Sequence, residues 1–160
     1  MRNPNINKIH IILELLGYIM LMLSLAYAIV MINTIEGEIP THYNAYGEVD
    51  AYGSPTSLLI LPITMLSTCL IITACLHFLP ARSWNTGFKL NPARENIVLA
   101  DFGYMMASMV PEMGLFTMVV TYFFGKEGSI VMGASFALIA AMAVSVIVFF
   151  IKAYRDNKAD

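Results

Sequence analysis

The chain has 160 residues, of which 58% are hydrophobic and only 12% are charged, with a formal net charge of −2. Soluble domains carry about 25% charged residues, so this composition excludes an ordinary water-soluble fold. It also argues against nucleic-acid binding, because the sequence contains no basic stripe. We therefore expect an all-α integral membrane protein in which residues 1–160 form a single domain.

Four segments of the chain are long and apolar enough to be transmembrane helices. Crossing about 30 Å of hydrocarbon takes roughly 20 residues at about 1.5 Å per residue. The candidate spans are residues 11–33, 57–80, 97–124 and 130–151. We expect them to form a four-helix bundle, with a longer outer loop at residues 34–56 between the first two helices.

The basic residues predict how these spans are oriented. Lys126 is on one side of the predicted membrane, and the other eight Lys and Arg residues are on the opposite side. Positively charged loops stay in the cytoplasm. Both termini are therefore expected in the cytoplasm, and the loop at residues 34–56 is expected outside.

The outer loop carries the densest polar chemistry of the sequence. Residues 44–47, Asn-Ala-Tyr-Gly, are nearly repeated as residues 50–53, Asp-Ala-Tyr-Gly. Asn and Asp bond to their own backbone and Gly tolerates positive φ, so two successive tight turns are predicted. We expect an ordered ligand-binding loop with His42 directed towards the helices, and a polar cavity that opens outward and is lined by His42, Asp50 and residues of the third span. Its candidate ligand-binding residues are His42, Asn44, Glu48 and Asp50.

A divalent metal is an alternative ligand for this loop. Imidazole and carboxylate groups are metal ligands, which makes His42 and Asp50 candidates. Their spacing matches no standard zinc or calcium pattern. The other interpretation is that the two side chains brace the turns by hydrogen bonding, and no other cofactor is expected.

The third span contains an acidic residue at membrane depth. Asp101, Tyr104, Ser108 and Glu112 fall on one helical stripe. Glu112 follows Pro111 near the middle of the span, where an unpaired charge is expensive. Glu112 is therefore a further candidate for ligand binding, or for an ion or proton site. Alternatively, it is a protonated structural residue bonded to hydroxyl groups such as those of Ser24, Thr64 or Thr68.

The remaining polar and small residues of the helices have structural interpretations. Asp101, Glu14 and His77 lie close to the predicted cytoplasmic helix ends. Asp101 is expected to reach the interface, and Glu14 and His77 to reach it or to cap their helices. Cys69 and Cys75 are six residues apart and point to different faces, so they are expected to pack rather than form a disulfide. In the fourth span a stripe of small residues predicts close helix packing: Gly133, Ala137, Ala141 and Ser145.

The outer loop resembles the signature of a bacterial membrane family of unknown function, whose domain also forms the N-terminal part of SdpI-like immunity proteins. The matching positions are Ile39, Pro40, His42, Asn44, Gly47, Asp50, Gly53 and Ser54. Weaker matches follow at Leu61-Pro62, Asn85, Lys89, Glu95-Asn96 and Glu112. The resemblance implies a multi-pass protein of the bacterial plasma membrane. SdpI-like members that protect against a toxin carry an additional C-terminal membrane domain, which is not present in these 160 residues.

Three functions are compatible with these features. The favoured one is a ligand-binding, sensory or immunity-type role through the outer loop, with the lipid bilayer as surroundings and a peptide, toxin or membrane protein as partner. The second is a small membrane enzyme or metal site that uses His42, Asp50 and Glu112. The third is a proton- or ion-coupled transport component that uses Glu112.

Overall fold

The computed structural model describes residues 6–124 and 128–159. It contains four long helices, α1 (Lys8–Thr34), α2 (Ile60–Phe78), α3 (Glu95–Phe123) and α4 (Gly128–Lys158). The 3₁₀ turn Pro55–Leu59 leads into α2. With this turn included, four helices are long and apolar enough to cross a membrane, which confirms the predicted number of candidate spans. Helix α4 continues beyond the predicted apolar limit at Ile151, because its last two turns are polar but still helical.

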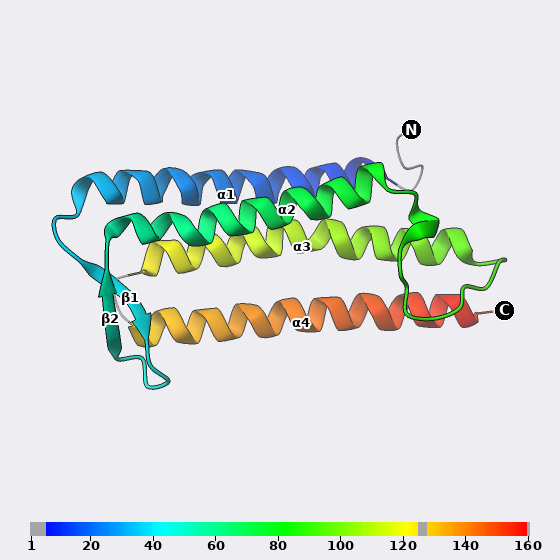
Figure 1. The fold of residues 1–160 in the computed structure, drawn as a ribbon. Coiled ribbons are helices and arrows are strands. Elements are labelled where there is room, and N and C mark those ends of the chain that lie inside the picture. The colour runs from blue at the N-terminus through cyan, green and yellow to red at the C-terminus, as the bar shows by residue number, and fades with distance from the viewer. Residues whose placement is uncertain (1–5, 125–127, 160) are drawn as a thin grey trace.

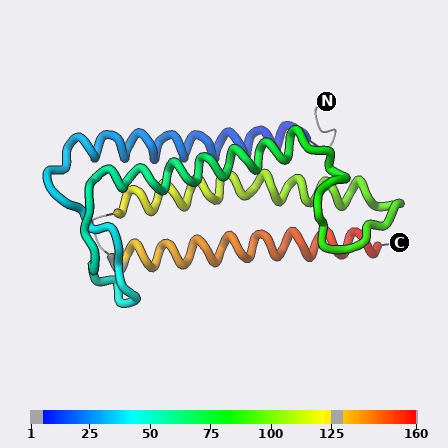
Figure 2. The backbone as a smooth tube through the Cα atoms, viewed as in Figure 1, coloured from blue at the N-terminus to red at the C-terminus, as the bar shows by residue number. Residues whose placement is uncertain are grey.

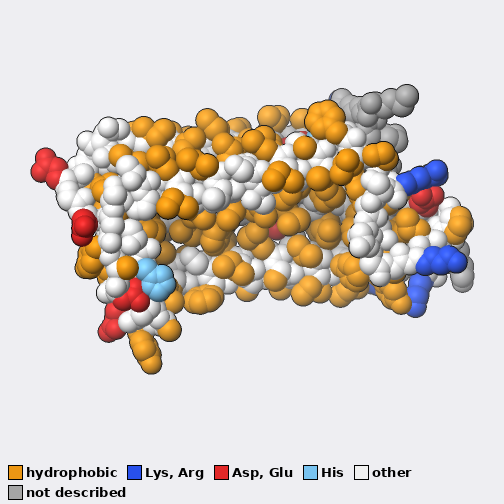
Figure 3. All heavy atoms as spheres, in the orientation of Figure 1, with side chains coloured by type: hydrophobic (Ala, Val, Ile, Leu, Met, Phe, Trp, Pro, Cys, Tyr) orange, Lys and Arg blue, Asp and Glu red, His pale blue; other side chains and the backbone are white. Residues whose placement is uncertain are grey.

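The helices run side by side in alternating directions (Figure 1, Figure 2). The start of α1, the α2–α3 connection and the end of α4 lie together at one end, which we call the terminal end. A β-hairpin lies at the opposite end, which we call the hairpin end. Figure 3 shows Lys and Arg side chains at the terminal end, and acidic side chains with a histidine at the hairpin end. Arg2 and Lys126, which entered the charge argument, lie outside the described residues.

Helix α3 is the central packing element, because it contacts α1, α2 and α4. Two glycines bring its backbone close to that of α1. A Cβ atom on Gly17 would lie 2.5 Å from the carbonyl carbon and oxygen of Val110, and one on Gly114 would lie 2.7 Å from the carbonyl oxygen of Gly17. Helices in membranes associate through such close backbone packing. Here the glycines that permit it are on α1 and α3.

Most of the predicted packing stripe of α4 has no helix neighbour in the described structure. Gly133, Ala137 and Ala141 are exposed, and a Cβ atom on Gly133 would meet no atom within 4 Å. Only Ser145 is half-buried. Helix α4 packs on α3 near the terminal end instead, where Ala153 joins a buried cluster with Val98 and Phe102 and the Phe150 ring lies edge-on to Phe102. The prediction failed because small residues show where helices can approach, but not which helix face has a neighbour.

The outer loop is a β-hairpin, which corrects the expectation of two turns. Strands β1 (Ile39–Tyr43) and β2 (Val49–Gly53) pair antiparallel, with two irregularities around His42. The first predicted turn is present, since the Gly47 N–H donates to the Asn44 carbonyl at 2.9 Å and Gly47 has a φ of 82°. The second is wrong, because Asp50 and Gly53 both lie in strand β2, and Gly53 pairs with Ile39 of β1.

Candidate functional site

The turn of the hairpin is organised by the side chain of Asn44. Its Oδ1 accepts hydrogen bonds from the backbone N–H groups of Tyr46 (2.9 Å) and Glu48 (3.0 Å). Its Nδ2 donates to Oε2 of Glu48 at 2.8 Å. One amide thus satisfies two turn donors and positions a carboxylate. Asn44 and Glu48, two of the predicted ligand-binding residues, are therefore brought together.

The other two loop candidates, His42 and Asp50, form a cross-strand pair. Nδ1 of His42 lies 2.5 Å from Oδ1 of Asp50. Their side chains are 68% and 44% exposed. His42 is therefore presented outwards, which corrects the expectation that it points towards the helices. The exposed pair can hydrogen-bond to a bound molecule, or supply two of the ligands of a metal ion. The described residues contain no group of three or more His, Cys, Asp or Glu side chains placed to hold a metal ion.

The hairpin is anchored at its root rather than at its tip. Ile39 of β1 is buried in one cluster with Ala28 of α1 and Leu58 of the 3₁₀ turn. Tyr43 adds an edge-to-face contact with Phe124, at 6.4 Å between ring centroids. A cavity lies beside this root, but neither His42 nor Asp50 lines it. This cavity is therefore not the expected polar cavity lined by these two residues.

Glu112 lies apart from the hairpin, in the middle of α3. It is half-buried, and its Oε2 atom is buried without a hydrogen-bond partner among the described residues. Its eleven-residue separation from Phe123 corresponds to about 16 Å of helix. The structure therefore does not bring Glu112 together with His42 and Asp50. The hydroxyl groups expected to pair with it bond instead to backbone carbonyls of their own helices: Ser24, Thr64 and Thr68.

Helical periodicity indicates which neighbour Glu112 faces. Asp101 on α3 accepts a hydrogen bond from Nζ of Lys152 on α4, and Lys152 also pairs with Asp156 at 2.9 Å. Asp101 thus forms an interhelical ion pair, which corrects the expectation that it merely reaches the interface. Glu112 follows Asp101 by eleven residues, about three helical turns, so it lies on the same α4-facing side of α3.

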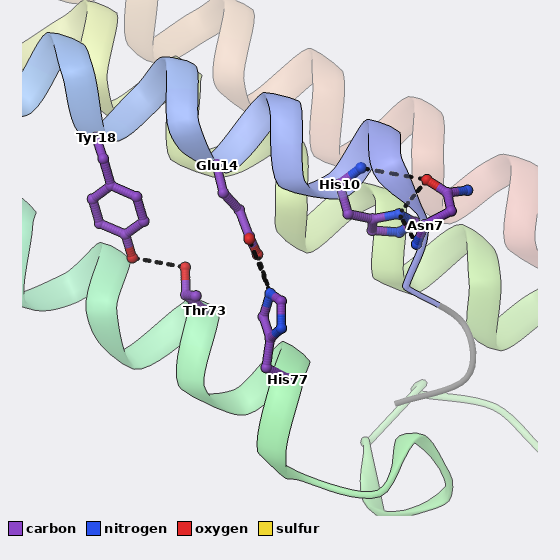
Figure 4. A network of polar contacts seen from close by, with 6 residues as sticks. All are labelled: Asn7, His10, Glu14, Tyr18, Thr73 and His77. Atoms are coloured by element: carbon purple, nitrogen blue, oxygen red, sulfur yellow. Dashed lines mark hydrogen bonds and ion pairs between the residues drawn. The ribbon is translucent and has the colours of Figure 1, made fainter. Parts of the chain in front are cut away.

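A second polar cluster, which the sequence analysis undervalued, lies between α1 and α2 (Figure 4). Nε2 of His77 lies 2.9 Å from both carboxylate oxygens of Glu14. The side chains of His77 and Glu14 are 20% and 8% exposed. One turn further along α1, the Tyr18 hydroxyl donates to Oγ1 of Thr73 at 2.8 Å. These contacts tie α1 to α2 by polar groups inside two candidate spans.

The first turn of α1 extends this cluster towards α3. Oδ1 of Asn7 accepts a hydrogen bond from the Ile9 N–H at 2.9 Å, which caps the helix. The buried ring of His10 stacks on Tyr104 with centroids 4.2 Å apart, beside Gly103. A Cβ atom on Gly103 would lie 3.3 Å from Nε2 of His10, so the glycine makes room for the ring. We call Asn7, His10, Glu14 and His77 the inner cluster.

The inner cluster can hold and exchange a proton, because a carboxylate and an imidazole lie within hydrogen-bond distance. Sequence reasoning placed Glu14 and His77 at helix ends and gave them capping or interface roles. Their separation of 63 residues carries no local pairing signal. The available signal was the cost of an ionisable residue in an apolar span, which favours a partner or a function.

Comparison with known families matches only the hairpin region. The model of a domain of unknown function (DUF1648) matches residues 19–66, which is less than half of the 160 residues. This segment holds most of α1, the whole hairpin and the start of α2, but not Glu14, His77 or Glu112. No curated protein matches the chain, and no solved structure does. The chain is thus similar to a family without an assigned function over the segment that carries the hairpin.

Proposed function

We propose that this protein is a multi-pass protein of the bacterial plasma membrane that binds a ligand at its hairpin end, in a sensory or immunity-type role. The observation that carries the proposal is the anchored hairpin. Its root is packed on α1 and on the turn before α2. Its polar groups are held by short-range bonds and directed outwards. A rigid support with exposed hydrogen-bonding groups suits recognition, because little side-chain freedom is lost on binding.

The arrangement of charge supports the orientation assumed in this proposal. The described Lys and Arg residues lie at the terminal end, whereas residues 9–81, which include the hairpin, contain none. By the positive-inside rule the termini are cytoplasmic and the hairpin faces outwards. The exposed apolar faces of the four helices then contact lipid.

The resemblance of the loop to the domain of SdpI-like proteins suggests the class of binding partner. A secreted peptide or toxin, or another membrane protein, would meet the exposed rings of Tyr46 and Tyr52 beside the His42–Asp50 pair. Tyrosines supply large contact area with few rotatable bonds, which favours protein and peptide recognition.

Complementation in the native bacterium tests this function. A deletion strain is challenged with a panel of membrane-active peptides and with secreted material from its own species. We expect increased sensitivity that the wild-type gene restores. The variant with both His42→Ala and Asp50→Ala should fail to restore it at an equal membrane level, whereas the control Ala45→Ser should succeed. Full rescue by the double variant, or a deletion strain as resistant as wild type throughout, would refute the proposal.

A second candidate function is a proton- or ion-coupled component. It is favoured by the inner cluster and by the buried Oε2 of Glu112, because ionisable groups inside membrane spans commonly mark proton or ion pathways. The test is proton flux into dye-loaded proteoliposomes under an imposed gradient. Flux that Glu14→Gln or Glu112→Gln abolishes would support coupling, and flux equal to that of empty liposomes would exclude it.

A further inference from the structure

A cavity of about 300 Å³ lies beside the root of the hairpin. Its apolar walls include Met31 of α1, Ile39 of β1, Leu58 of the 3₁₀ turn and Phe124 after α3. It therefore lies where four separate segments of the chain meet. Its volume is at the lower end of the range for small-molecule pockets, about 300–1,000 Å³, which are also mostly apolar with a few polar groups.

One polar group in this cavity has no hydrogen-bond partner in the described part of the chain. Thr121 lines the cavity and is only 3% exposed. Its Oγ1 atom is buried and has no hydrogen-bond partner among the described residues. Thr117, one turn earlier, instead donates to the Met113 carbonyl at 2.7 Å. A buried hydroxyl without a partner is costly, so Thr121 indicates that a polar atom of another molecule belongs in the cavity.

A second polar group gives the site its charge. Glu38, which immediately precedes β1, lines the cavity and is exposed. Its surroundings are acidic, with Glu36, Glu48 and Asp50 in the same segment and no Lys or Arg in residues 9–81. Lys126 follows two residues after Phe124 in the sequence, but acidic residues outnumber it in this part of the chain, and an excess of negative charge attracts cations. Tyr27 also lines the cavity, and an aromatic face stabilises an organic cation nearby.

We propose that this cavity binds an amphiphilic organic cation. The apolar part of the ligand lies against the walls, its ammonium group pairs with Glu38, and a polar atom bonds to Oγ1 of Thr121. This inference rests on the proposed ligand-binding function and specifies the class of ligand. Two sources share this chemistry, a free amphiphilic amine and the amino headgroup of a lipid.

Titration calorimetry with a matched pair of probes tests the proposal. The probes are 4-phenylbutylammonium and the neutral 4-phenylbutanol, added to protein in dodecyl maltoside micelles at low ionic strength, with protein-free micelles as reference. We expect saturable binding of the ammonium probe at least about threefold tighter than that of the alcohol, since a partly exposed charge contributes modestly. Added salt should reduce this difference.

Three variants locate the binding site. Glu38→Gln should remove the preference for the cation, whereas Glu36→Gln, which changes a neighbouring carboxylate outside the cavity lining, should preserve it. Thr121→Leu adds volume inside the cavity and should abolish binding of both probes. Because Glu38 and Glu36 are both exposed, their variants are expected to fold and the comparison remains valid if Thr121→Leu does not.

The outcomes separate the free amine from the aminolipid, and the cation assignment from the proposed function. Phosphatidylethanolamine in the micelles should weaken probe binding if an aminolipid is the ligand, and should leave it unchanged if a free amine is. Absence of saturable binding, equal affinity for the alcohol, or equal effects of Glu36→Gln and Glu38→Gln would overturn the inference. If the His42→Ala/Asp50→Ala variant still fails in complementation, only the cation assignment falls. If that variant complements fully while the cation binds, the proposed function falls.

Discussion

Replacing Gly17 by alanine should separate α1 from α3 where their backbones approach closely. The added methyl carbon would lie 2.5 Å from the carbonyl carbon and oxygen of Val110 and 2.7 Å from the nitrogen of Pro111. Ordinary contacts begin at 3.4 Å, so the helices must move apart by roughly 1 Å. All three atoms belong to the backbone, and no side-chain rotation can relieve the clash.

The net cost is the difference between two opposing effects. Overpacking a close contact destabilises by about 1–3 kcal/mol. Alanine in place of glycine favours the helix by up to about 1 kcal/mol. We therefore expect Gly17→Ala to lower the free energy of unfolding by about 1–2 kcal/mol. Gly133→Ala is the matched control, because its Cβ atom would enter open space and only the helix preference should remain.

Unfolding of purified protein by SDS in mixed micelles, followed by circular dichroism, measures both variants. The expected order of stability is Gly133→Ala at or slightly above wild type, and Gly17→Ala clearly below it. Equal stability of the two variants would show that α1 and α3 do not meet at these glycines, and would remove the basis for the central position of α3.

Three further predictions concern the polar groups and the orientation. A double-mutant cycle of Glu14→Gln and His77→Gln in the same unfolding assay should give a coupling of about 0.5–2 kcal/mol, and additive effects would contradict their pairing. Glu112→Leu should raise the free energy of unfolding, because it removes a buried oxygen without a partner, whereas Glu112→Gln should leave the fold intact; a strongly destabilised leucine variant would show that the carboxylate is needed structurally. In a variant without the native cysteines, a cysteine replacing Ala45 should react with an impermeant maleimide on intact cells, and one replacing Lys89 only after permeabilisation; the reverse labelling would invert the proposed topology.

The helices could be predicted from the sequence because membrane spans are specified by composition over long windows. The ends of the helices could not be predicted where a helix is longer than its apolar segment. The predicted fourth span ends at Ile151, but the helix continues to Lys158, since its polar last turns form backbone hydrogen bonds as readily as apolar ones. An apolar window therefore gives the part of a helix that can lie in lipid, but not its full length.

Only the turn of the hairpin was predicted from the sequence, and its strands were not. Asn44 and Gly47 indicated a turn, and the turn is present. The strands were missed because their residues are mixed in character, with Pro40 in β1 and Gly53 ending β2, both of which are unfavourable in strands. A turn flanked by segments of similar length is itself a hairpin signal. The repeated Asn/Asp-Ala-Tyr-Gly pattern instead suggested a second turn, although Asp50 lies in a strand.

Two acidic residues of the apolar spans show what cannot be predicted from the sequence. Glu14 and Glu112 each interrupt an apolar span, and the cost of burying a charge applies to both. In the structure Glu14 meets His77 of α2, while Oε2 of Glu112 meets no hydrogen-bond partner among the described residues. Whether such an acid has a partner depends on which helix packs against it and on how that helix is rotated about its axis. The residues next to the acid in the sequence determine neither. Sequence identifies the residues that need a partner, whereas only the packing of the helices shows which of them has one.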